Sequence, residues 1–293
     1  MKKSRKIWIG VGAFIMTGSA DGAPSADAQQ IYQTGAATKH IVGRVADRSR
    51  MDVLAQAAAT FGQGGEAGEA GEGGEAGIDA QAAASDPVEY GVALQVIAAH
   101  YHAGLAAYRA KEHEAGAQLF AHGLSEVYAE MEDVFKAKGV AGLDTAMQGA
   151  IDAAVAGKPF EDVRRQVRKV LAALRAAEKR APKSDLSQNA VKAKIVAAMI
   201  ERAAAQYAVV QKDDNLEAYL DGLGFAIAAR RRAQDVLPWI RKNDVRKEKA
   251  VRQALSELRR AYPGAARPAA FAVGEAELLA AASAAQLAVS GLR

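Results

Sequence analysis

After residue 86, short breaks rich in glycine, proline, asparagine and aspartate divide the chain into segments of helical length. The first segment opens with Asp86-Pro87-Val88-Glu89, where Asp86 suits the N-cap, Pro87 the first helical turn, and Glu89 a capping box. Pro238 should kink its helix or end it early. The breaks together predict helices over residues 87–110, 113–138, 143–156, 160–180, 187–210, 214–241, 244–261 and 275–290.

The composition favours the same fold. Half of the residues are hydrophobic, but only 6% are aromatic, and alanine is abundant. Strands favour β-branched and aromatic side chains, so we expect an all-α chain of closely packed helices. The absence of cysteine excludes disulfides, thiolate metal sites and thiol catalysis. The metalloprotease, nucleophile-elbow, phosphate-loop and dinucleotide-binding motifs are missing too, and we do not predict an enzyme.

An internal repeat predicts how the helices are grouped. Shifted by 99 residues, Val92–Leu124 aligns with Val191–Leu223 without a gap. The repeat predicts two tandem antiparallel four-helix bundles, over residues 85–183 and 184–293. Seven aligned positions are identical, namely Val92/Val191, Ala98/Ala197, Ala99/Ala198, Ala106/Ala205, Tyr108/Tyr207, Gly123/Gly222 and Leu124/Leu223.

The N-terminal residues are similar to an export signal. Four basic residues precede the apolar run 7–16, which is short for a membrane span, and Ala26-Asp27-Ala28 suits cleavage. We therefore expect a signal peptide over residues 1–28 and a periplasmic protein that is not transmembrane after processing; a retained anchor is the alternative. Removing four basic and two acidic residues would lower the formal charge from +4 to +2, which does not argue for nucleic acid.

Residues 29–84 are expected to form a flexible region. Within it, Gly62–Gly77 has glycine at every third position from 65 to 77 and carries four glutamates. Glycine at this density cannot hold a helix, so the stretch is typical of a flexible acidic linker. The alternative is a tether that collects cations weakly.

The stretch Val92–Phe135 contains four of the five histidines of the chain. If it folds as an antiparallel hairpin with its turn near Lys111, His100 and His122 each lie 11 residues from that turn. Partners that are equidistant from a turn lie at one height, so the two imidazoles can face each other. The hairpin therefore predicts a site between its two helices.

Carboxylates extend the same site. Glu126 follows His122 by four residues on one helix face, and Glu130 lies a further turn along. Two imidazoles with one or two carboxylates inside a bundle are how helical proteins hold iron, zinc or copper. Haem with Met131 as an axial ligand is a lesser alternative. We predict a transition-metal ion, with iron favoured, bound by His100, His122 and Glu126, with Glu130 or His102 as helpers.

The repeat offers an internal comparison for these residues. His100 corresponds to Met199, and Glu126 to Phe225 if no insertion follows Leu124. Burying a polar group without a partner costs a few kcal/mol, and a cation is one such partner. The alternatives are that the histidines are hydrogen-bonded bundle residues or that these side chains form a solvated helix face.

The second half of the chain is basic. Arg230–Arg260 contains 11 basic and four acidic residues, beginning with three consecutive arginines. Such helices are most often solvated, but they can dock an acidic partner or anionic lipid. The alternative function is therefore a non-enzymatic scaffold that binds an acidic envelope protein, and the acidic first half is a possible internal partner.

The export signal, the duplicated bundles and the His/Glu site together resemble the imelysin-like periplasmic proteins linked to iron uptake. The signature of that family is a Gly-x-His-x-x-Glu run, whereas His122 and Glu126 are one residue further apart. The resemblance implies a metal-related role in uptake, storage or sensing. The Gly/Glu tract with AAHYHAG and FAHGLSEVYAEME, within residues 62–140, also resembles uncharacterised exported helical proteins of proteobacteria.

Overall fold

The described part of the chain is helical throughout. The structure, a computed structural model, describes residues 77–293, and this range contains helices and no strand. The all-α prediction is therefore confirmed. The predicted signal peptide and nearly all of the Gly/Glu-rich linker lie outside the described residues. None of the helices in residues 77–293 is long and apolar enough to cross a membrane.

The helices begin and end close to the predicted bounds. The predicted helix 113–138 is one continuous rod made of α4, a π-helical segment η2 and α5. The elements are α2 (Ala80–Ser85), α3 (Pro87–Arg109), α4 (His113–His122), η2 (Gly123–Tyr128), α5 (Ala129–Ala137), α6 (Leu143–Val155), α7 (Phe160–Glu178), α8 (Gln188–Lys212), α9 (Leu216–Asn243), α10 (Val245–Ala261) and α11 (Glu275–Ser290).

Side-chain caps explain several of these starts. Asp86, Ser187 and Asn215 accept hydrogen bonds from backbone N–H groups of the first turns of α3, α8 and α9, at 2.6, 3.1 and 3.0 Å. Each bond satisfies a donor that the helix itself leaves unpaired. Pro238 does not end its helix early, because α9 continues to Asn243 with buried side chains on both sides of the proline.

Helix α2 begins within the region 29–84 that we expected to be flexible, so residues 80–84 are helical rather than flexible. Asp79 caps the helix by accepting a hydrogen bond from the Ala82 N–H at 2.9 Å. Ile78 and Ala83 are buried against the rest of the fold. Arg202 of α8 also binds this segment, since it donates to the Gly77 carbonyl at 3.0 Å.

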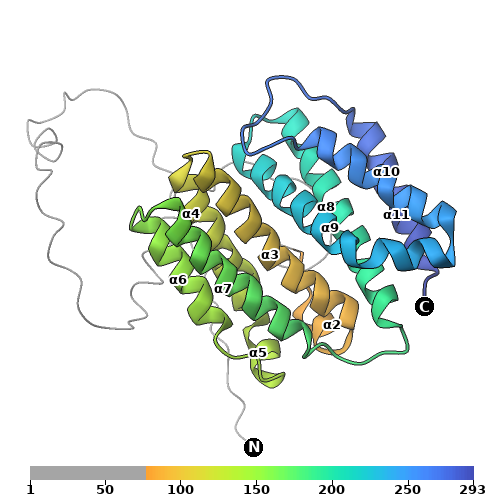
Figure 1. Cartoon of the computed structure of the whole chain (residues 1–293), viewed down its shortest axis with the longest axis horizontal. Coiled ribbons are helices and arrows are strands. Elements are labelled where there is room, and N and C mark those ends of the chain that lie inside the picture. Colours follow the sequence, from red (N-terminus) through yellow and green to blue (C-terminus); the bar gives the residue numbers. More distant parts are fainter. Residues whose placement is uncertain (1–76) are drawn as a thin grey trace, which may run out of the picture. The chain divides into compact units, whose positions relative to one another are not determined.

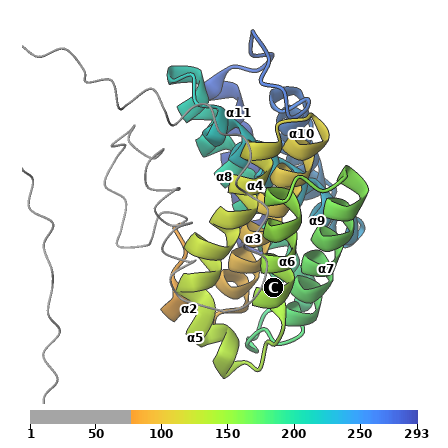
Figure 2. The same ribbon diagram turned by 90° about the vertical axis from the view of Figure 1, so that its left-hand side faces the viewer.

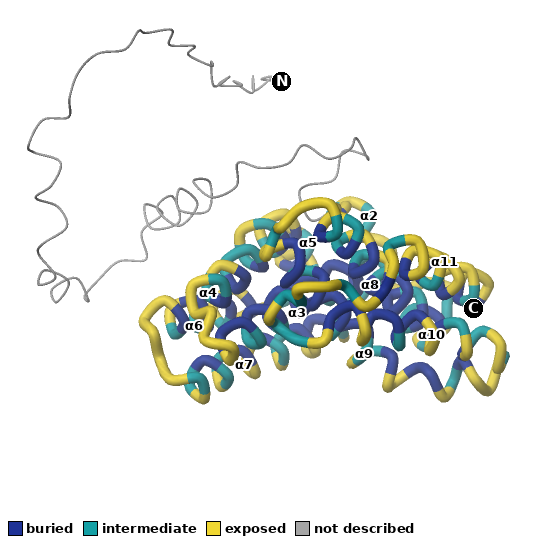
Figure 3. Tube along the Cα trace, turned by 90° about the horizontal axis from the view of Figure 1, so that it is seen from above, coloured by how far each residue is buried: buried dark blue, intermediate teal, exposed yellow. Residues whose placement is uncertain are grey.

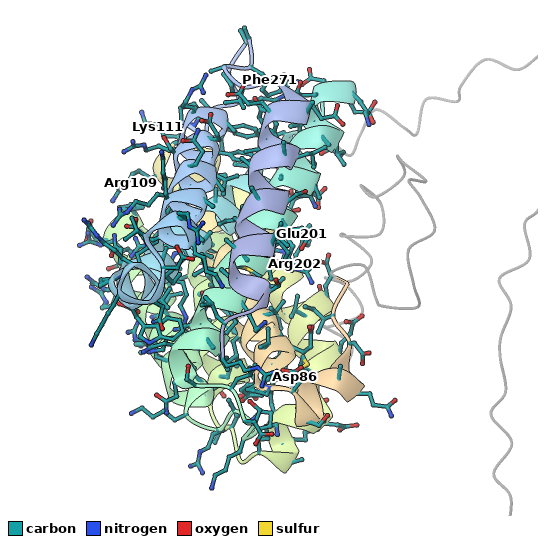
Figure 4. All side chains as sticks on the ribbon, turned by 90° about the vertical axis from the view of Figure 1, so that its right-hand side faces the viewer. Asp86, Arg109, Lys111, Glu201, Arg202 and Phe271 are labelled. Carbon is teal, nitrogen blue, oxygen red and sulfur yellow. The ribbon has the colours of Figure 1, made fainter. Side chains whose placement is uncertain are left out.

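Helix α3 lies at the centre of the described fold (Figures 1 and 3). Sixteen of its 23 residues are buried, which leaves it apolar on almost every side, as expected of a helix surrounded by others. It packs against α4 and α7 on one side and against α8 and α9 on the other. Asp86 and Arg109 mark its opposite ends in Figure 4.

The long helices form two groups of four neighbours: α3 belongs to the first group and also packs on α8 and α9 of the second. In the first group α4 packs on α6, and α6 on α7 (Figure 2). In the second group α8 packs on α9 and α11, while α10 packs on both α9 and α11. The two groups have the same order of neighbours when α3, α4, α6 and α7 are matched with α8, α9, α10 and α11. Both groups belong to one compact unit.

Candidate functional site

His100 is a buried polar residue in the middle of α3, with 5% of its side chain exposed. Its Nδ1 lies 2.9 Å from the carbonyl oxygen of Val96, one turn earlier in the same helix. Because a carbonyl only accepts hydrogen bonds, Nδ1 carries the ring proton. Burial lowers the pKa of His100, so the ring is neutral and Nε2 presents a bare lone pair.

His122, the last residue of α4, lies beside His100 across the hairpin. The two ring centroids are 6.5 Å apart and nearly perpendicular. The chain turns at Lys111, which adopts a positive φ of 73° between the two helices. The hairpin thus brings the two imidazoles to one level, as their equal distance from Lys111 predicts.

Two carboxylates of α9 complete the cluster, and sequence reasoning missed both. Asp221 Oδ1 lies 3.7 Å from His100 Nε2, and Glu217 Oε1 lies 3.2 Å from His122 Nδ1. Glu126 of η2 approaches the same His122 nitrogen at 3.8 Å. The cluster therefore draws on α3, on the α4–η2 rod and on α9. One sequence signal could have pointed to Asp221, because the 99-residue shift aligns it with His122 of the first repeat.

The carboxyl group of Asp221 is strongly perturbed by its surroundings. Its Oδ1 is buried and has no hydrogen-bond partner among the described residues. Burial, followed by the nearby charge of Glu217, raises the pKa of Asp221 to about 7, while His122 acts in the opposite direction. Near neutral pH this carboxyl group therefore exists in both protonation states. A perturbed acid in a buried polar cluster is typical of a functional site.

Two glycines bring the surrounding helices close to His100. A Cβ on Gly224 of α9 would lie 2.5 Å from the carbonyl oxygen of Ala99, so α9 and α3 meet there backbone to backbone. A Cβ on Gly123 would lie 3.1 Å from the Tyr101 ring and 3.4 Å from the His100 Cβ. Gly123 also opens the π-helical segment η2, and π-helical turns occur frequently at functional sites.

The structure leaves two of the sequence-predicted residues outside this cluster. Glu130 is exposed on α5 and has no hydrogen bond or ion pair among the described residues. His102 lies two residues from His100 on another face of α3. Burial and the positive charge of Arg231 lower the pKa of His102 to about 3. The positive charge of Arg231 would also repel a metal ion at His102, so His102 is a poor metal ligand.

The cluster has the residue types of a metal site, but within residues 77–293 no three His, Asp or Glu side chains are arranged around one point where an ion would sit. No protein-family model, curated protein or solved structure matches the chain. Its function must therefore be inferred from the side chains themselves.

Proposed function

We propose that this chain binds one transition-metal ion between α3, α4 and α9, with His100 and Asp221 as the central ligands. One observation carries the proposal. His100 Nε2 and Asp221 Oδ1 are two acceptors that face each other 3.7 Å apart in the interior. Two lone pairs in such a place need a cation between them, which is either a metal ion or a proton.

The distances suit a metal ion after small adjustments. Nitrogen and oxygen ligands bind zinc at about 2.0–2.2 Å, which separates two tetrahedral ligand atoms by about 3.4 Å. The separations at His100 and His122, 3.7 and 3.2 Å, bracket this value. His122 or Glu217 must turn toward the central pair to add a third ligand. Glu217 is 56% exposed and has room to do so.

The outer hydrogen bond of His100 supports the same assignment. Metal-bound histidines usually donate their second ring N–H to a carboxylate or backbone carbonyl, which fixes the ring and its tautomer. The bond from Nδ1 to the Val96 carbonyl does this for His100. Imidazole and carboxylate ligands suit iron, zinc and copper, and the imelysin-like resemblance favours iron. Periplasmic uptake, storage or sensing of that metal is the corresponding role, without enzymatic activity.

Metal binding can be tested on the purified, metal-stripped protein by titration with Zn²⁺ and, without oxygen, with Fe²⁺. We expect about one ion per chain, and His100→Gln and Asp221→Asn should each weaken binding at least about tenfold. His102→Gln, on the same helix, and Glu130→Gln, an exposed carboxylate, are matched controls that should bind as the wild type does. Unchanged affinity in both His100→Gln and Asp221→Asn would rule out this site.

A proton is the competing occupant of the pair. If protonated Asp221 alone satisfies His100, the protein binds no metal ion, and Asp221→Asn changes only the pH dependence of stability. Metal titration and pH titration of the same variant therefore distinguish the two occupants.

We also propose that α8–α11 repeat α3–α7 by duplication, as two bundles joined through α3. Tyr108 Oη donates to the Lys158 carbonyl, between α6 and α7, at 2.6 Å. Tyr207, its partner at the 99-residue shift, donates to the Val273 carbonyl, between α10 and α11, at 2.9 Å. The same tyrosine thus binds the same connection in each group, which supports a common origin.

The π-helical segment changes one correspondence between the proposed repeats. A π-helical turn holds one more residue than an α-helical turn, so the shift falls by one after Leu124. Glu126 then aligns with Gly224 rather than Phe225, and buried Val127 aligns with buried Phe225. Under this alignment, His100 of the first repeat still corresponds to an apolar side chain, Met199, in the second repeat. Glu126 no longer does, because it corresponds to a glycine.

The alternative function, docking of an acidic partner through Arg230–Arg232, has fewer side chains available than the sequence suggests. Arg232 already forms a two-pronged ion pair with Glu178 of α7. The acidic partner of this arginine is thus internal. Arg231 is exposed, and Arg230 borders a separate groove.

A further inference from the structure

A second polar site lies in the C-terminal half of α9, away from Glu217 and Asp221. It is a groove between α9 and α10, two helices that run side by side in Figure 1. Its volume is about 390 Å³. Among the residues that form its walls there is no aspartate or glutamate. They are Arg230, Ala233, Gln234, Leu237, Arg252, Leu255, Ser256 and Arg259.

Two of the three arginines of this groove are not neutralised. Arg230 and Arg259 have no hydrogen bond or ion pair among the described residues, whereas Arg252 pairs with the buried Glu248 on its own helix. Burial, followed by the charges of Arg259 and Arg231, lowers the pKa of Arg230. Two unpaired guanidinium groups that repel each other across one groove leave a favourable place for an anion.

The floor of the groove is apolar. Ala233, Leu237 and Leu255 are buried there, with 1%, 7% and 9% exposed. Gln234 and Ser256 add side-chain hydrogen-bond donors beside this floor. The groove therefore offers charge-assisted hydrogen bonds to an anionic group of a ligand and apolar contacts to the rest of that ligand, which is the usual composition of a small-molecule site.

We propose that the groove between α9 and α10 binds a small soluble phosphate monoester, with the phosphate between Arg230 and Arg259 and its carbon body on Leu237 and Leu255. Two planar guanidinium forks match the charge and the several oxygens of a phosphate dianion. The volume holds a ligand of modest size.

A membrane surface fits this groove less well. Within residues 77–293 the large hydrophobic side chains that are exposed are Val155, Val209, Leu216, Val245, Leu279 and Leu287, and none of them borders the groove. The groove therefore has no exposed large apolar side chain at its edge that could insert into a lipid bilayer. The site thus favours a dissolved ligand, independent of any metal ion bound at His100.

The test uses phenyl phosphate as the probe, titrated calorimetrically into the protein in the presence of a chelator. We expect saturable binding that Arg230→Gln and Arg259→Gln each weaken on the order of tenfold, since each removes charge-assisted hydrogen bonds. Arg246→Gln is the matched control, because Arg246 is 94% exposed on the same helix α10 and lies outside the groove. Its binding should equal that of the wild type.

Further arms separate the sources of the anion. Inorganic phosphate should bind more weakly than phenyl phosphate, because it lacks the apolar body. Vesicles of phosphatidylcholine and phosphatidylglycerol, and a poly-glutamate peptide, should not bind in a way that depends on Arg230. Absence of phenyl phosphate binding, equal loss in the Arg246→Gln control, or Arg230-dependent binding of vesicles or peptide alone would overturn the proposal. Circular dichroism spectra and melting curves would establish that each variant is folded.

Discussion

Replacing Asp221 with asparagine removes a carboxylate that the fold holds in an unfavourable setting. Its pKa rises from 3.8 to about 7, mainly because it is buried and then because of the charge of Glu217. One pKa unit corresponds to about 1.4 kcal/mol, so ionised Asp221 costs roughly 4 kcal/mol of folding free energy relative to its protonated form. Asparagine keeps the size and shape of the side chain and removes this charge.

The sign of the effect follows from proton binding. Because the folded protein holds this proton more tightly than the unfolded chain, Asp221 makes the free energy of unfolding fall as the pH rises from about 4 to about 7. His100 acts in the opposite direction, since its lowered pKa makes the fold lose stability as the pH falls below 6.5. His122, Glu217 and Tyr262 also surround Asp221. These three groups and His100 are present in both the wild type and the Asp221→Asn variant.

Urea unfolding of the metal-free protein at pH 5 and pH 8 measures this difference. Because the cost accumulates above pH 3.8 at about 1.4 kcal/mol per pH unit, Asp221→Asn should be more stable than the wild type by roughly 1.5–2 kcal/mol at pH 5 and by roughly 4 kcal/mol at pH 8. Asp235→Asn, an exposed change on the same helix, should show no such difference between the two pH values. A stability difference between Asp221→Asn and the wild type that is the same at both pH values would refute the reasoning.

Four further substitutions test how the helices pack against one another. Gly224→Ala should destabilise the protein by about 1–3 kcal/mol, because its Cβ has no space against α3, whereas Gly149→Ala on α6 should be neutral or slightly stabilising in the same urea experiment. Tyr108→Phe and Tyr207→Phe should each cost about 1 kcal/mol; a negligible cost for either would argue that these bonds are not equivalent. Arg232→Met should lower the free energy of unfolding by about 1–3 kcal/mol at low salt by breaking the pair between α7 and α9; an unchanged melting temperature would contradict this.

The sequence predicted most helices because their signals are local. Asp86, Ser187 and Asn215 cap their helices through side-chain bonds that span two or three residues, and such bonds can be inferred without any tertiary structure. Helix α2 was missed because it has only six residues and follows a glycine-rich tract. It is stabilised by burial of Ala83, which depends on distant helices.

The candidate site was half predictable for the same reason. His100 and His122 belong to one hairpin, so their spacing from Lys111 was enough to pair them. Asp221 and Glu217 come from α9, about a hundred residues later, and they reach the site only because α9 packs directly on α3. That packing requires the close backbone approach at Gly224, which no periodic pattern reveals.

The proposed metal site requires a cation shared by His100 and Asp221. Crystals of the protein soaked in Zn²⁺ and measured at the zinc absorption edge would locate the ion by its anomalous signal. We expect one strong peak within about 2.2 Å of both His100 Nε2 and an Asp221 carboxylate oxygen, and no such peak in Asp221→Asn crystals. Peaks only on surface histidines, or an empty space between these two side chains in zinc-saturated crystals, would contradict it.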